Sequence, residues 1–425
     1  MFYLWAANRT RDPGACDYYR IKIPLIWMEK LGYARSYEDR GMGGESDYAA
    51  MFTADIDLFY STSGNDTLHQ IHTLNNMQPG TIQDGSLHYP PTTIWDCDDN
   101  PDYVHPFNQT YVVNGVRHYP TGDFLEPGES LEIENHKGER EMLWEDQVTT
   151  ALGEQARFDI ARNLQTMKTR WEVIRHAVGV TVPSPSLASY IKEVIKQPNV
   201  YVFPNTVVPE DYEEFPLVDT PRDEVRILWQ GGMSHYIDWY PLRDAIREVM
   251  QKYPHAKMVI WGEKFDWITD IISEKQLEFH PWTPYPAFKL KRGLLRAHIN
   301  LCPLSNNPFN WGKSAIKWYE GSIWSKPEAT LAANVGPYKE IKDGVNGLLY
   351  KNPEEFVQKL STLIENAELR QTLGMNARQW VLENRTPQAT IPGLFEFYQD
   401  CRAKTKGSRL YVPTQGEVSR LAVRR

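Results

Sequence analysis

The sequence predicts an α/β protein of two domains with parallel, doubly wound sheets. Its 425 residues are too many for one ordinary core and suit two domains of about 200 residues each. Short apolar segments alternate with amphipathic ones along the chain, and two of the apolar segments end in glycine. Strands that alternate with helices form parallel βαβ units, so this pattern predicts a doubly wound sheet.

The alternation is clearest in the second half of the chain. A strand over 225–230 leads into Gly231, a helix is expected over 238–252, and a strand over 256–261 leads into Gly262. The further strands and helices that we expect cover residues 277–280, 287–297, 299–304, 314–324, 347–350, 353–366 and 368–383. The second half therefore has the pattern of a complete βαβ domain.

The first half is less regular. The predicted strands cover residues 1–7, 55–59, 92–95, 179–182 and 201–203, and the predicted helices cover residues 19–31 and 154–177. Residues 105–145 are polar and rich in glycine and proline, which predicts an excursion or a lid.

An acidic, proline-rich stretch without periodicity separates the two halves. We therefore expect an N-terminal domain over 1–207, a linker over 208–224 and a C-terminal domain over 225–385. A helix over 386–404 and a basic tail over 405–425 would complete the chain.

Composition and charge narrow the class of protein. Hydrophobic residues make up 41% and charged residues 24%, which is an ordinary globular balance. The net charge of -9 argues against a general affinity for nucleic acid, although residues 402–425 carry seven Lys and Arg against Glu417 alone. That end is either a solvated tail or a contact for a polyanion or a membrane surface.

The four cysteines are far apart, which excludes a CxxC zinc site and indicates a reducing compartment. We find no signal peptide and no run of about 18 apolar residues. We therefore expect a cytoplasmic protein.

Gly231 and Gly232 lie between a predicted strand and a predicted helix, with Ser234 and His235 directly after them. Glycines let a ligand approach the backbone, and free N–H groups at a helix start favour phosphate. Many βα turns contain glycine, so the loop alone is a weak signal, and it is not a Walker loop.

A second candidate segment begins with Lys313 and Ser314. Glu320 lies seven residues after Lys313, so both side chains share one helix face about 10 Å apart along the axis. The lysine and serine could hold a diphosphate while Glu320 accepts hydrogen bonds from ribose. The alternative is a solvated Lys313, with Glu320 paired to Lys317 at i, i+3.

Two further segments follow predicted strand ends, where ligands bind in open α/β sheets. Trp282 and Thr283 lie where a nucleotide base could stack or bond to backbone, and Gly336 and Tyr338 lie at a later strand end.

The acidic pair Asp98 and Asp99 follows the strand expected over 92–95. A carboxylate there could bind acceptor hydroxyls or take a proton. The alternatives are a loop with Asx turns, and a metal site in which Asp98 forms a DxD pair with Asp96. In the first domain, Gly14, Tyr19 and Arg20 could approach a donor diphosphate, with Arg20 as the cation.

An ordered set of motifs resembles the C-terminal half of glycosyltransferases of the two-domain B-fold (GT-B), specifically family four and its phage and bacterial relatives. The matching pieces are 229–232, 234–235, 302–304, 309–320, 336–338 and 343–349, and they span most of residues 225–385. Weaker similarity covers 17–20, 182–187 and 203–205.

The resemblance implies two Rossmann-like domains facing across a cleft, with a C-terminal helix that crosses back to the N-terminal domain. It implies that Glu320 contacts ribose and that Lys313 binds phosphate. The family's first glutamate falls at Gly312, so that carboxylate is missing. The resemblance also implies no metal and no cofactor beyond a nucleotide-sugar co-substrate such as a UDP- or GDP-sugar, and a reaction that retains anomeric configuration.

We therefore expect a glycosyltransferase, with two alternatives on the same fold: a nucleotide-sugar epimerase and a non-catalytic binding protein. The acceptor could be a surface polysaccharide or lipid-linked sugar, a protein, or a hydroxymethylated DNA base of the kind that phages make. In the last case the protein would act in the host cytoplasm.

Overall fold

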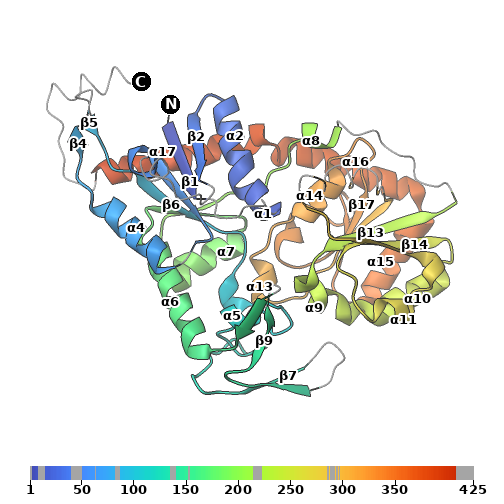
Figure 1. Ribbon diagram of the computed structural model, residues 1–425. Coiled ribbons are helices and arrows are strands. Elements are labelled where there is room, and N and C mark those ends of the chain that lie inside the picture. Colours follow the sequence, from blue (N-terminus) through green and yellow to red (C-terminus); the bar gives the residue numbers. More distant parts are fainter. Residues whose placement is uncertain are drawn as a thin grey trace. The chain divides into compact units, whose positions relative to one another are not determined.

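The computed structural model describes residues 2–7, 15–39, 50–62, 64–81, 87–134, 140–151, 154–213, 223–284, 287, 292, 295 and 297–407. They form two compact units (Figure 1). Unit 1 comprises Met1–Asp98, Thr166–Thr206 and Pro387–Arg425, and unit 2 comprises Asp99–Gln165 and Val207–Thr386.

Unit 1 is built on a six-stranded parallel sheet with the order β12-β11-β6-β3-β1-β2. The strands are β1 (Phe2–Ala7), β2 (Ala34–Asp39), β3 (Ile56–Tyr60), β6 (Thr92–Asp96), β11 (Gly179–Val182) and β12 (Val200–Val202). Most of their residues are buried, as expected for parallel strands that helices cover on both faces.

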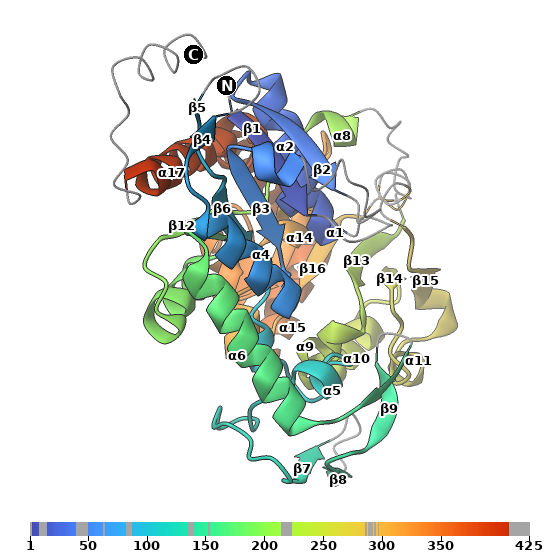
Figure 2. The ribbon, with the colours of Figure 1, turned by 60° about the vertical axis from the view of Figure 1, so that its left-hand side comes forward.

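Helices α4 (Asn65–Asn76) and α6 (Ile160–His176) cover one face of this sheet (Figure 2). Ile71 of α4 and Val173 of α6 share a core with Trp5 and Trp95 of the strands. The remaining helical segments before residue 207 are α1 (Ala15–Asp17), a π-helical turn η1 (Tyr18–Lys22), α2 (Ile23–Lys30), η2 (Pro101–Tyr103), α5 (Tyr111–Asn114), α7 (Pro185–Tyr190) and η3 (Ile191–Ile195).

The C-terminal helix α17 (Pro387–Gly407) packs in unit 1, beside the start of the chain. Its Phe395 ring stacks on Tyr33 with a centroid distance of 4.4 Å. Gly179 gives the helix room, because a Cβ there would lie 2.6 Å from Sγ of Cys401. The predicted return of the last helix to the first domain is confirmed.

Unit 2 holds a second six-stranded parallel sheet with the order β15-β14-β13-β16-β17-β18. The strands are β13 (Val225–Gly231), β14 (Ala256–Gly262), β15 (Leu277–Pro281), β16 (Ile299–Cys302), β17 (Ala329–Ala333) and β18 (Leu348–Tyr350). In chain order this is 3-2-1-4-5-6, the doubly wound order, and its switch point lies between β13 and β16.

The described helical segments of unit 2 after residue 207 begin with α8 (Glu210–Glu213), which precedes β13, and the others lie between or after the strands. The others are η4 (Met233–His235), α9 (Tyr236–Trp239), η5 (Tyr240–Leu242), α10 (Arg243–Lys252), α11 (Ile268–Ile271), η6 (Glu274–Gln276), α13 (Pro308–Trp311), α14 (Ile316–Ser322), η7 (Gly336–Glu340), α15 (Pro353–Glu365) and α16 (Ala367–Asn384). The helix expected over 287–297 lies largely outside the described residues. No helix in the described part of the chain is long and apolar enough to cross a membrane.

Residues 99–165 pack with unit 2, although they precede the second half of unit 1 in the chain. They carry two antiparallel pairs, β7 (Leu131–Glu134) with β8 (Arg140–Leu143) and β9 (Val148–Ala151) with β10 (Glu154–Arg157). Phe309 of α13 joins their apolar core beside Tyr111 and Phe158. The helix expected over 154–177 begins only at Ile160, because residues 154–157 pair with β9 instead.

Candidate functional site

The carboxyl ends of β13 and β14 meet at two glycines. Gly262 has a φ of +117°, and a Cβ there would lie 2.2 Å from the carbonyl oxygen of Gly231. The next residue, Glu263, donates its backbone N–H to the same oxygen at 3.0 Å. Glycine is needed at 262 because only its backbone allows this φ and this approach. The two strand ends therefore lie close together and carry no side chain at Gly231 and Gly262, so a ligand can reach the backbone there. We call these two residues the glycine edge.

Lys317 of α14 brings a positive charge to this edge. A Cβ on Gly231 would lie 3.2 Å from Nζ of Lys317, so the glycine leaves space for the ammonium group. Nζ lies 2.9 Å from Nε2 of His235. The side-chain amide of Asn300 donates to the carbonyl oxygen of Lys317 at 2.8 Å and so fixes the backbone of α14 against β16.

His235 connects this ammonium to a buried carboxylate. Nδ1 of His235 lies 2.7 Å from Oδ2 of Asp238. An ammonium group only donates, so Nε2 must accept from Lys317 while Nδ1 carries the proton and donates to Asp238. Burial and the charge of Lys317 lower the pKa of His235 to about 4, which keeps the imidazole neutral.

Asp238 is buried and holds three donors in place. Besides His235, its Oδ1 accepts from the backbone N–H of Ser305 at 2.8 Å and from Nδ2 of Asn310 at 2.6 Å. These bonds tie the loop after β16 to the helix after β13. Burial lowers the pKa of Lys317 to about 8, so the ammonium is mostly charged at neutral pH.

Glu320 lies on the same helix as Lys317, but it bonds to a strand residue. Nε2 of Gln230, the next-to-last residue of β13, donates to Oε2 of Glu320 at 2.5 Å. The other amide atom, Oε1 of Gln230, is buried and accepts no hydrogen bond from the described residues. Both side chains are buried, and Oε1 of Gln230 is an acceptor that the described residues leave unused.

Lys313 pairs with Asp99, one of the two predicted acidic residues. Its Nζ lies 3.2 Å from Oδ1 of Asp99 and 4.3 Å from the centre of the Phe309 ring, and the side chain is only 14% exposed. A Cβ on Gly312 would lie 3.5 Å from Cβ of Asn100. The 99–100 segment therefore lies beside the position where the resemblance leaves a carboxylate missing.

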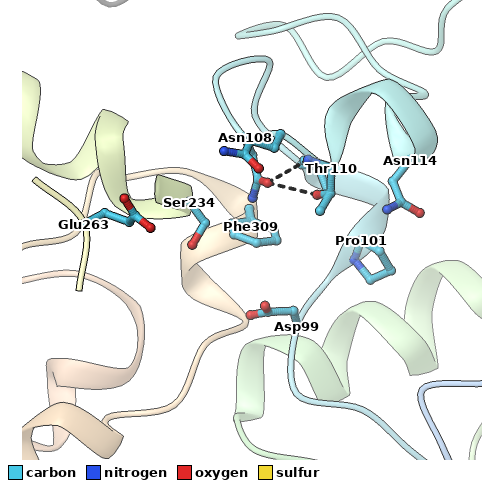
Figure 3. Close-up of a pocket in the computed structure, with 10 residues that line it drawn as sticks. Asp99, Pro101, Asn108, Thr110, Asn114, Ser234, Glu263 and Phe309 are labelled. Carbon is cyan, nitrogen blue, oxygen red and sulfur yellow. Dashed lines mark hydrogen bonds between the residues drawn. The ribbon is translucent and has the colours of Figure 1, made fainter. Parts of the chain in front are cut away.

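A cavity of about 420 Å³ opens next to these residues (Figure 3). Ser234 and Glu263 border it from the strand-end loops, and Phe309 borders it from α13. The other lining residues belong to the segment before α6: Asp99, Pro101, Val104, Asn108, Gln109, Thr110 and Asn114. The cavity thus adjoins the glycine edge and lies wholly within unit 2.

Several predicted residues have different surroundings. Trp282 is 64% exposed, and Thr283 accepts from Nε1 of Trp261 at 3.3 Å. Tyr338 is buried, and its hydroxyl is hydrogen-bonded to the Cys302 thiol. Gly336 is required by its φ of +53° and by lack of space, because a Cβ there would lie 2.7 Å from the carbonyl oxygen of Asn310. Ser314 is half-buried just before α14.

The predicted acceptor-side residues lie in unit 1. Arg20 is fully buried in the π-helical turn η1, and its Nε donates to Oδ1 of Asp96 at 2.9 Å. Its Nη1 also donates to the carbonyl of Phe203. Arg20 is therefore engaged within its own unit and is not an exposed cation. Tyr19 is buried beside it, Asp98 is half-buried, and Gly14 lies outside the described residues.

Sequence reasoning missed Gln230 and Asp238, and it treated Lys317 only as a partner for Glu320. All three are polar residues in or beside segments of apolar neighbours. Lys317 and Glu320 flank Trp318 and Tyr319, which are buried. The signal that could have found them is a polar residue at the buried end of an apolar strand, such as Gln230 after Trp229.

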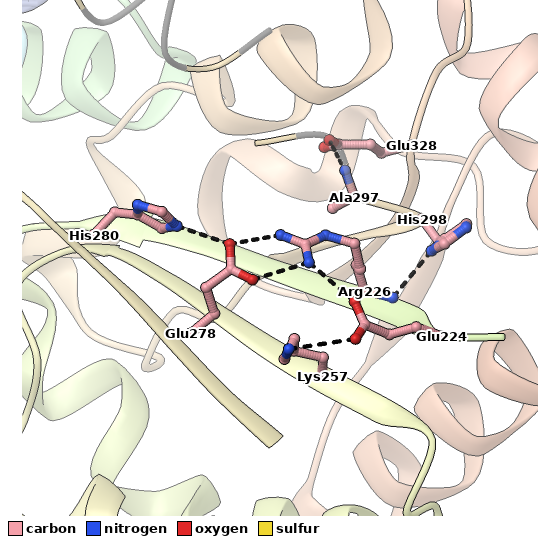
Figure 4. A network of polar contacts seen from close by, with 8 residues as sticks. All are labelled: Glu224, Arg226, Lys257, Glu278, His280, Ala297, His298 and Glu328. Atoms are coloured by element: carbon pink, nitrogen blue, oxygen red, sulfur yellow. Dashed lines mark hydrogen bonds and ion pairs between the residues drawn. The ribbon is translucent and has the colours of Figure 1, made fainter. Parts of the chain in front are cut away.

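A separate polar network crosses β13, β14 and β15 (Figure 4). Arg226 donates two hydrogen bonds to Glu278, at 2.9 and 2.7 Å, and a third to Glu224 at 3.0 Å. His280 lies 2.8 Å from the same Glu278 carboxylate. Burial alone would raise the pKa of Glu278, but the bonds from Arg226 and His280 lower it to about 2. This network fastens the strands to one another.

Comparisons with known proteins agree with this architecture. Solved structures with the same arrangement include sucrose-phosphate synthase from Thermosynechococcus elongatus, with a TM-score of 0.58 and 11% identity over 95% of this chain and 100% of that one. HepE from Anabaena, in complex with UDP and glucose, has a TM-score of 0.54 and 10% identity over 94% of this chain and 100% of that one. The fold is that of the GT-B glycosyltransferases.

Two other matches are partial. TarM has a TM-score of 0.50 and 15% identity over 88% of this chain, which spans 57% of TarM. A segment of 64 residues, 14% of the chain, is 45% identical to an uncharacterized glycosyltransferase of Methanocaldococcus jannaschii and covers 18% of that protein. No protein-family model matches the chain. The likenesses to solved structures confirm the predicted α/β fold class of two Rossmann-like units.

Proposed function

We propose that this protein is a glycosyltransferase that moves a sugar from a nucleotide-sugar to an acceptor hydroxyl. The observation that carries the proposal is the grouping of Lys317, His235 and Asp238 beside the glycine edge of Gly231 and Gly262. This grouping lies at the carboxyl ends of the strands, at the switch point of the sheet, where α/β folds bind nucleotides. HepE, which has this fold, was solved with UDP-glucose.

In this proposal the donor diphosphate lies against the backbone of Gly231 and Gly232. Lys317 neutralises its charge, and His235 and Asp238 hold the ammonium in place. Glu320 and the free acceptor of Gln230 receive hydrogen bonds from the ribose hydroxyls. Lys313 supplies a second positive charge near Asp99.

Transfer makes one bond to the anomeric carbon and breaks one. The acceptor hydroxyl oxygen bonds to the anomeric carbon of the sugar, and the bond from that carbon to the diphosphate oxygen breaks with its electron pair leaving on the diphosphate. The hydroxyl proton passes to a base or to the leaving phosphate. Asp98 and Asp99 remain the proposed carboxylates for the acceptor side.

The resemblance to family four supports a finer proposal, namely transfer with retained anomeric configuration and without a bound metal. Proton NMR of the first product anomer tests retention, and assays with and without EDTA test metal dependence. A product of inverted configuration contradicts retention. Activity that is lost with EDTA and restored by Mg²⁺ or Mn²⁺ contradicts metal independence.

The acceptor is proposed to be a glycan or a hydroxymethylated DNA base of the phage type. Arg402 is buried and paired with Asp55, but the basic residues from 404 to 425 support the DNA acceptor, while the net charge of -9 favours the glycan. Transfer of radiolabelled sugar to hydroxymethylated DNA at several salt concentrations, with the intact chain and a chain ending at residue 404, separates the two. No transfer to such DNA by the intact chain excludes that acceptor.

Incubation with UDP-, GDP- and ADP-sugars tests the main proposal. We expect calorimetric binding of at least one of them and slow release of its nucleotide. Isomerisation of the donor alone, seen by NMR, would instead indicate an epimerase. Tight binding without turnover across a broad acceptor panel would indicate a non-catalytic binding protein, for which the glycine at 312 is the supporting observation. No binding of any sugar nucleotide rejects all three functions.

A further inference from the structure

The cavity that adjoins the glycine edge has an unusual lining for a phosphate-handling protein. Its described lining residues include two carboxylates, Asp99 and Glu263, and no Lys, Arg or His. Asp99 is paired with Lys313, so the repulsion comes mainly from Glu263, whose charge disfavours a phosphate or a carboxylate inside the cavity. The cavity therefore suits a neutral ligand with many hydrogen-bonding groups.

The polar side chains of the lining have capacity left for a ligand. Glu263 and Asn114 make no side-chain hydrogen bond with the described residues, although both border the cavity. The Asn108 carboxamide oxygen is held by the N–H and the hydroxyl of Thr110, both at 3.0 Å, so its amide nitrogen remains to donate (Figure 3). Carboxylate and carboxamide groups of this kind pair well with sugar hydroxyls, which both donate and accept.

The cavity also offers an apolar surface and a suitable size. The ring of Phe309 lines it beside the aliphatic Val104 and Pro101. Sugar rings expose C–H faces that pack on aromatic and aliphatic side chains, and binding pockets for small ligands measure about 300 to 1,000 Å³. The volume of about 420 Å³ falls in the lower part of that range, as expected for one or two sugar rings.

The position of the cavity connects it to the proposed donor site. Ser234 lines it one residue before His235, and Glu263 lines it one residue after Gly262. A sugar attached to a diphosphate at the glycine edge would need to extend only past Ser234 to enter the cavity. The carboxylate of Asp99 is held by Lys313 at 3.2 Å, so contacts within the protein already fix this side of the cavity.

From this geometry we infer that the cavity binds a neutral sugar ring, with Glu263 and Asn114 recognising its hydroxyl groups and Phe309 packing on its C–H face. The inference rests on the proposed function, because that function supplies the sugar. The ring belongs either to the donor or to the acceptor, and the experiment below separates these two sources.

The test compares Glu263→Ala and Asn114→Ala with the wild-type protein and with Glu274→Ala, an exposed glutamate of η6 that lies outside the lining. Calorimetry measures the affinity for UDP, UDP-glucose and UDP-N-acetylglucosamine, or for the preferred nucleotide and its sugars. If the ring is the donor's, we expect both cavity variants to bind the sugar nucleotide about tenfold more weakly while binding the bare nucleotide like wild type. Glu274→Ala should leave both affinities unchanged.

If the ring is the acceptor's, the affinity for the sugar nucleotide and its slow hydrolysis should stay at the wild-type level. The KM for a sugar acceptor should then rise about tenfold in both cavity variants. Unchanged donor affinity together with an unchanged acceptor KM in both variants overturns the inference while leaving the proposed function intact.

A third measurement needs no nucleotide. Saturation-transfer NMR with methyl glucoside, methyl galactoside and N-acetylglucosamine reports weak binding of free sugars directly. Signals in the wild type that disappear in Glu263→Ala and persist in Glu274→Ala support sugar binding in the cavity. This holds even if no sugar nucleotide binds, and in that case only the proposed function fails. Equal signals in the wild type and both variants reject the inference. The absence of any signal in the wild type, with every free sugar and every sugar nucleotide, also rejects it.

Discussion

Nζ of Lys317 lies 2.9 Å from Nε2 of His235, an ammonium donating to a neutral imidazole. The two residues are 82 positions apart in the chain and come from α14 and η4, so their contact joins two separate loops of unit 2. Within the described part of the chain, no carboxylate forms an ion pair with this ammonium. The positive charge at the glycine edge is therefore left to attract an anion.

The affinity for a sugar nucleotide should fall at alkaline pH. Burial lowers the pKa of Lys317 to about 8, so the ammonium is charged below this pH and loses its proton above it. The diphosphate of a sugar nucleotide keeps its charge at neutral and mildly alkaline pH, where the uracil or guanine base is also neutral, so a change there reports the protein. Calorimetry across this range should give a constant Kd up to about pH 7 and a rising Kd above about pH 8.

Replacing Lys317 by methionine provides the control for this prediction. We expect Lys317→Met to bind about tenfold more weakly at about pH 6.5, because one charge-assisted hydrogen bond is lost, and to lose most of the alkaline decrease. A variant that keeps the wild-type pH dependence would assign the titration to another group. A wild-type Kd that stays constant across the whole range would contradict the role of Lys317 as the donor's counter-charge.

Asp238→Asn should weaken donor binding although Asp238 is buried behind His235. The asparagine oxygen can still accept from Ser305 and Asn310, but its amide then faces Nδ1 of His235. The imidazole must accept there, which moves its proton to Nε2 and turns an N–H towards the Lys317 ammonium. We expect a loss of about 1 to 3 kcal/mol in unfolding free energy and a several-fold rise in donor Kd, measured by urea melts and calorimetry.

His235→Ala tests in the same experiment whether the imidazole acts by positioning the Lys317 ammonium. It removes the acceptor of Lys317 but leaves Asp238 bonded to Ser305 and Asn310. If the imidazole only positions the ammonium, His235→Ala and Asp238→Asn should raise the donor Kd to a similar extent. Wild-type donor affinity in both variants would show that the imidazole does not position Lys317.

The strands of unit 2 could be predicted largely from the sequence because the signals for them are local. Apolar segments such as 225–230 and 256–261 lead into glycine and are followed by amphipathic helices, and each became a strand of the sheet. Residues 154–157 show the limit. Glu154 and Gln155 favour helix locally, yet the segment pairs with β9, because tertiary contacts override a weak propensity.

The candidate site was predictable only in part, for the same physical reason. Helix spacing predicted that Lys313 and Glu320 share one helix face, but α14 begins only at Ile316, so Lys313 lies before the helix while Lys317 and Glu320 lie on it. Spacing also offered only local partners for these residues. The structure instead pairs Lys317 with His235, Glu320 with Gln230, and Lys313 with Asp99, which is 214 residues away. Periodicity carries no information on contacts between segments so distant in the chain.

The backbone at the glycine edge should tolerate a methyl group at one glycine and not at the other. Gly262→Ala places a Cβ 2.2 Å from a carbonyl oxygen at a φ of +117°, whereas Gly232→Ala meets nothing within 4 Å. We expect Gly262→Ala to lose about 3 kcal/mol or more of unfolding free energy and Gly232→Ala to lose less than about 1 kcal/mol. Urea melts of the two variants measure this directly, and equal stabilities would contradict the tight approach of β13 and β14.

Glu278→Gln should destabilise the protein at neutral pH and have little effect in strong acid. The folded-state pKa of Glu278 is lowered to about 2 from the ordinary value of 4.5, so its ionised form stabilises the fold above about pH 4.5 and this contribution disappears as the pH falls through 2. The carboxylate is 27% exposed, and after allowance for solvent screening we expect about 1 to 2 kcal/mol. Urea melts at about pH 7, 4 and 2.5 should show a gap between wild type and variant that narrows with acidity. Glu274→Gln, with an exposed side chain on η6, should have the unfolding free energy of the wild type at each pH. A difference between Glu278→Gln and the wild type that stays constant with pH would show that the charge of Glu278 does not stabilise its contact with Arg226.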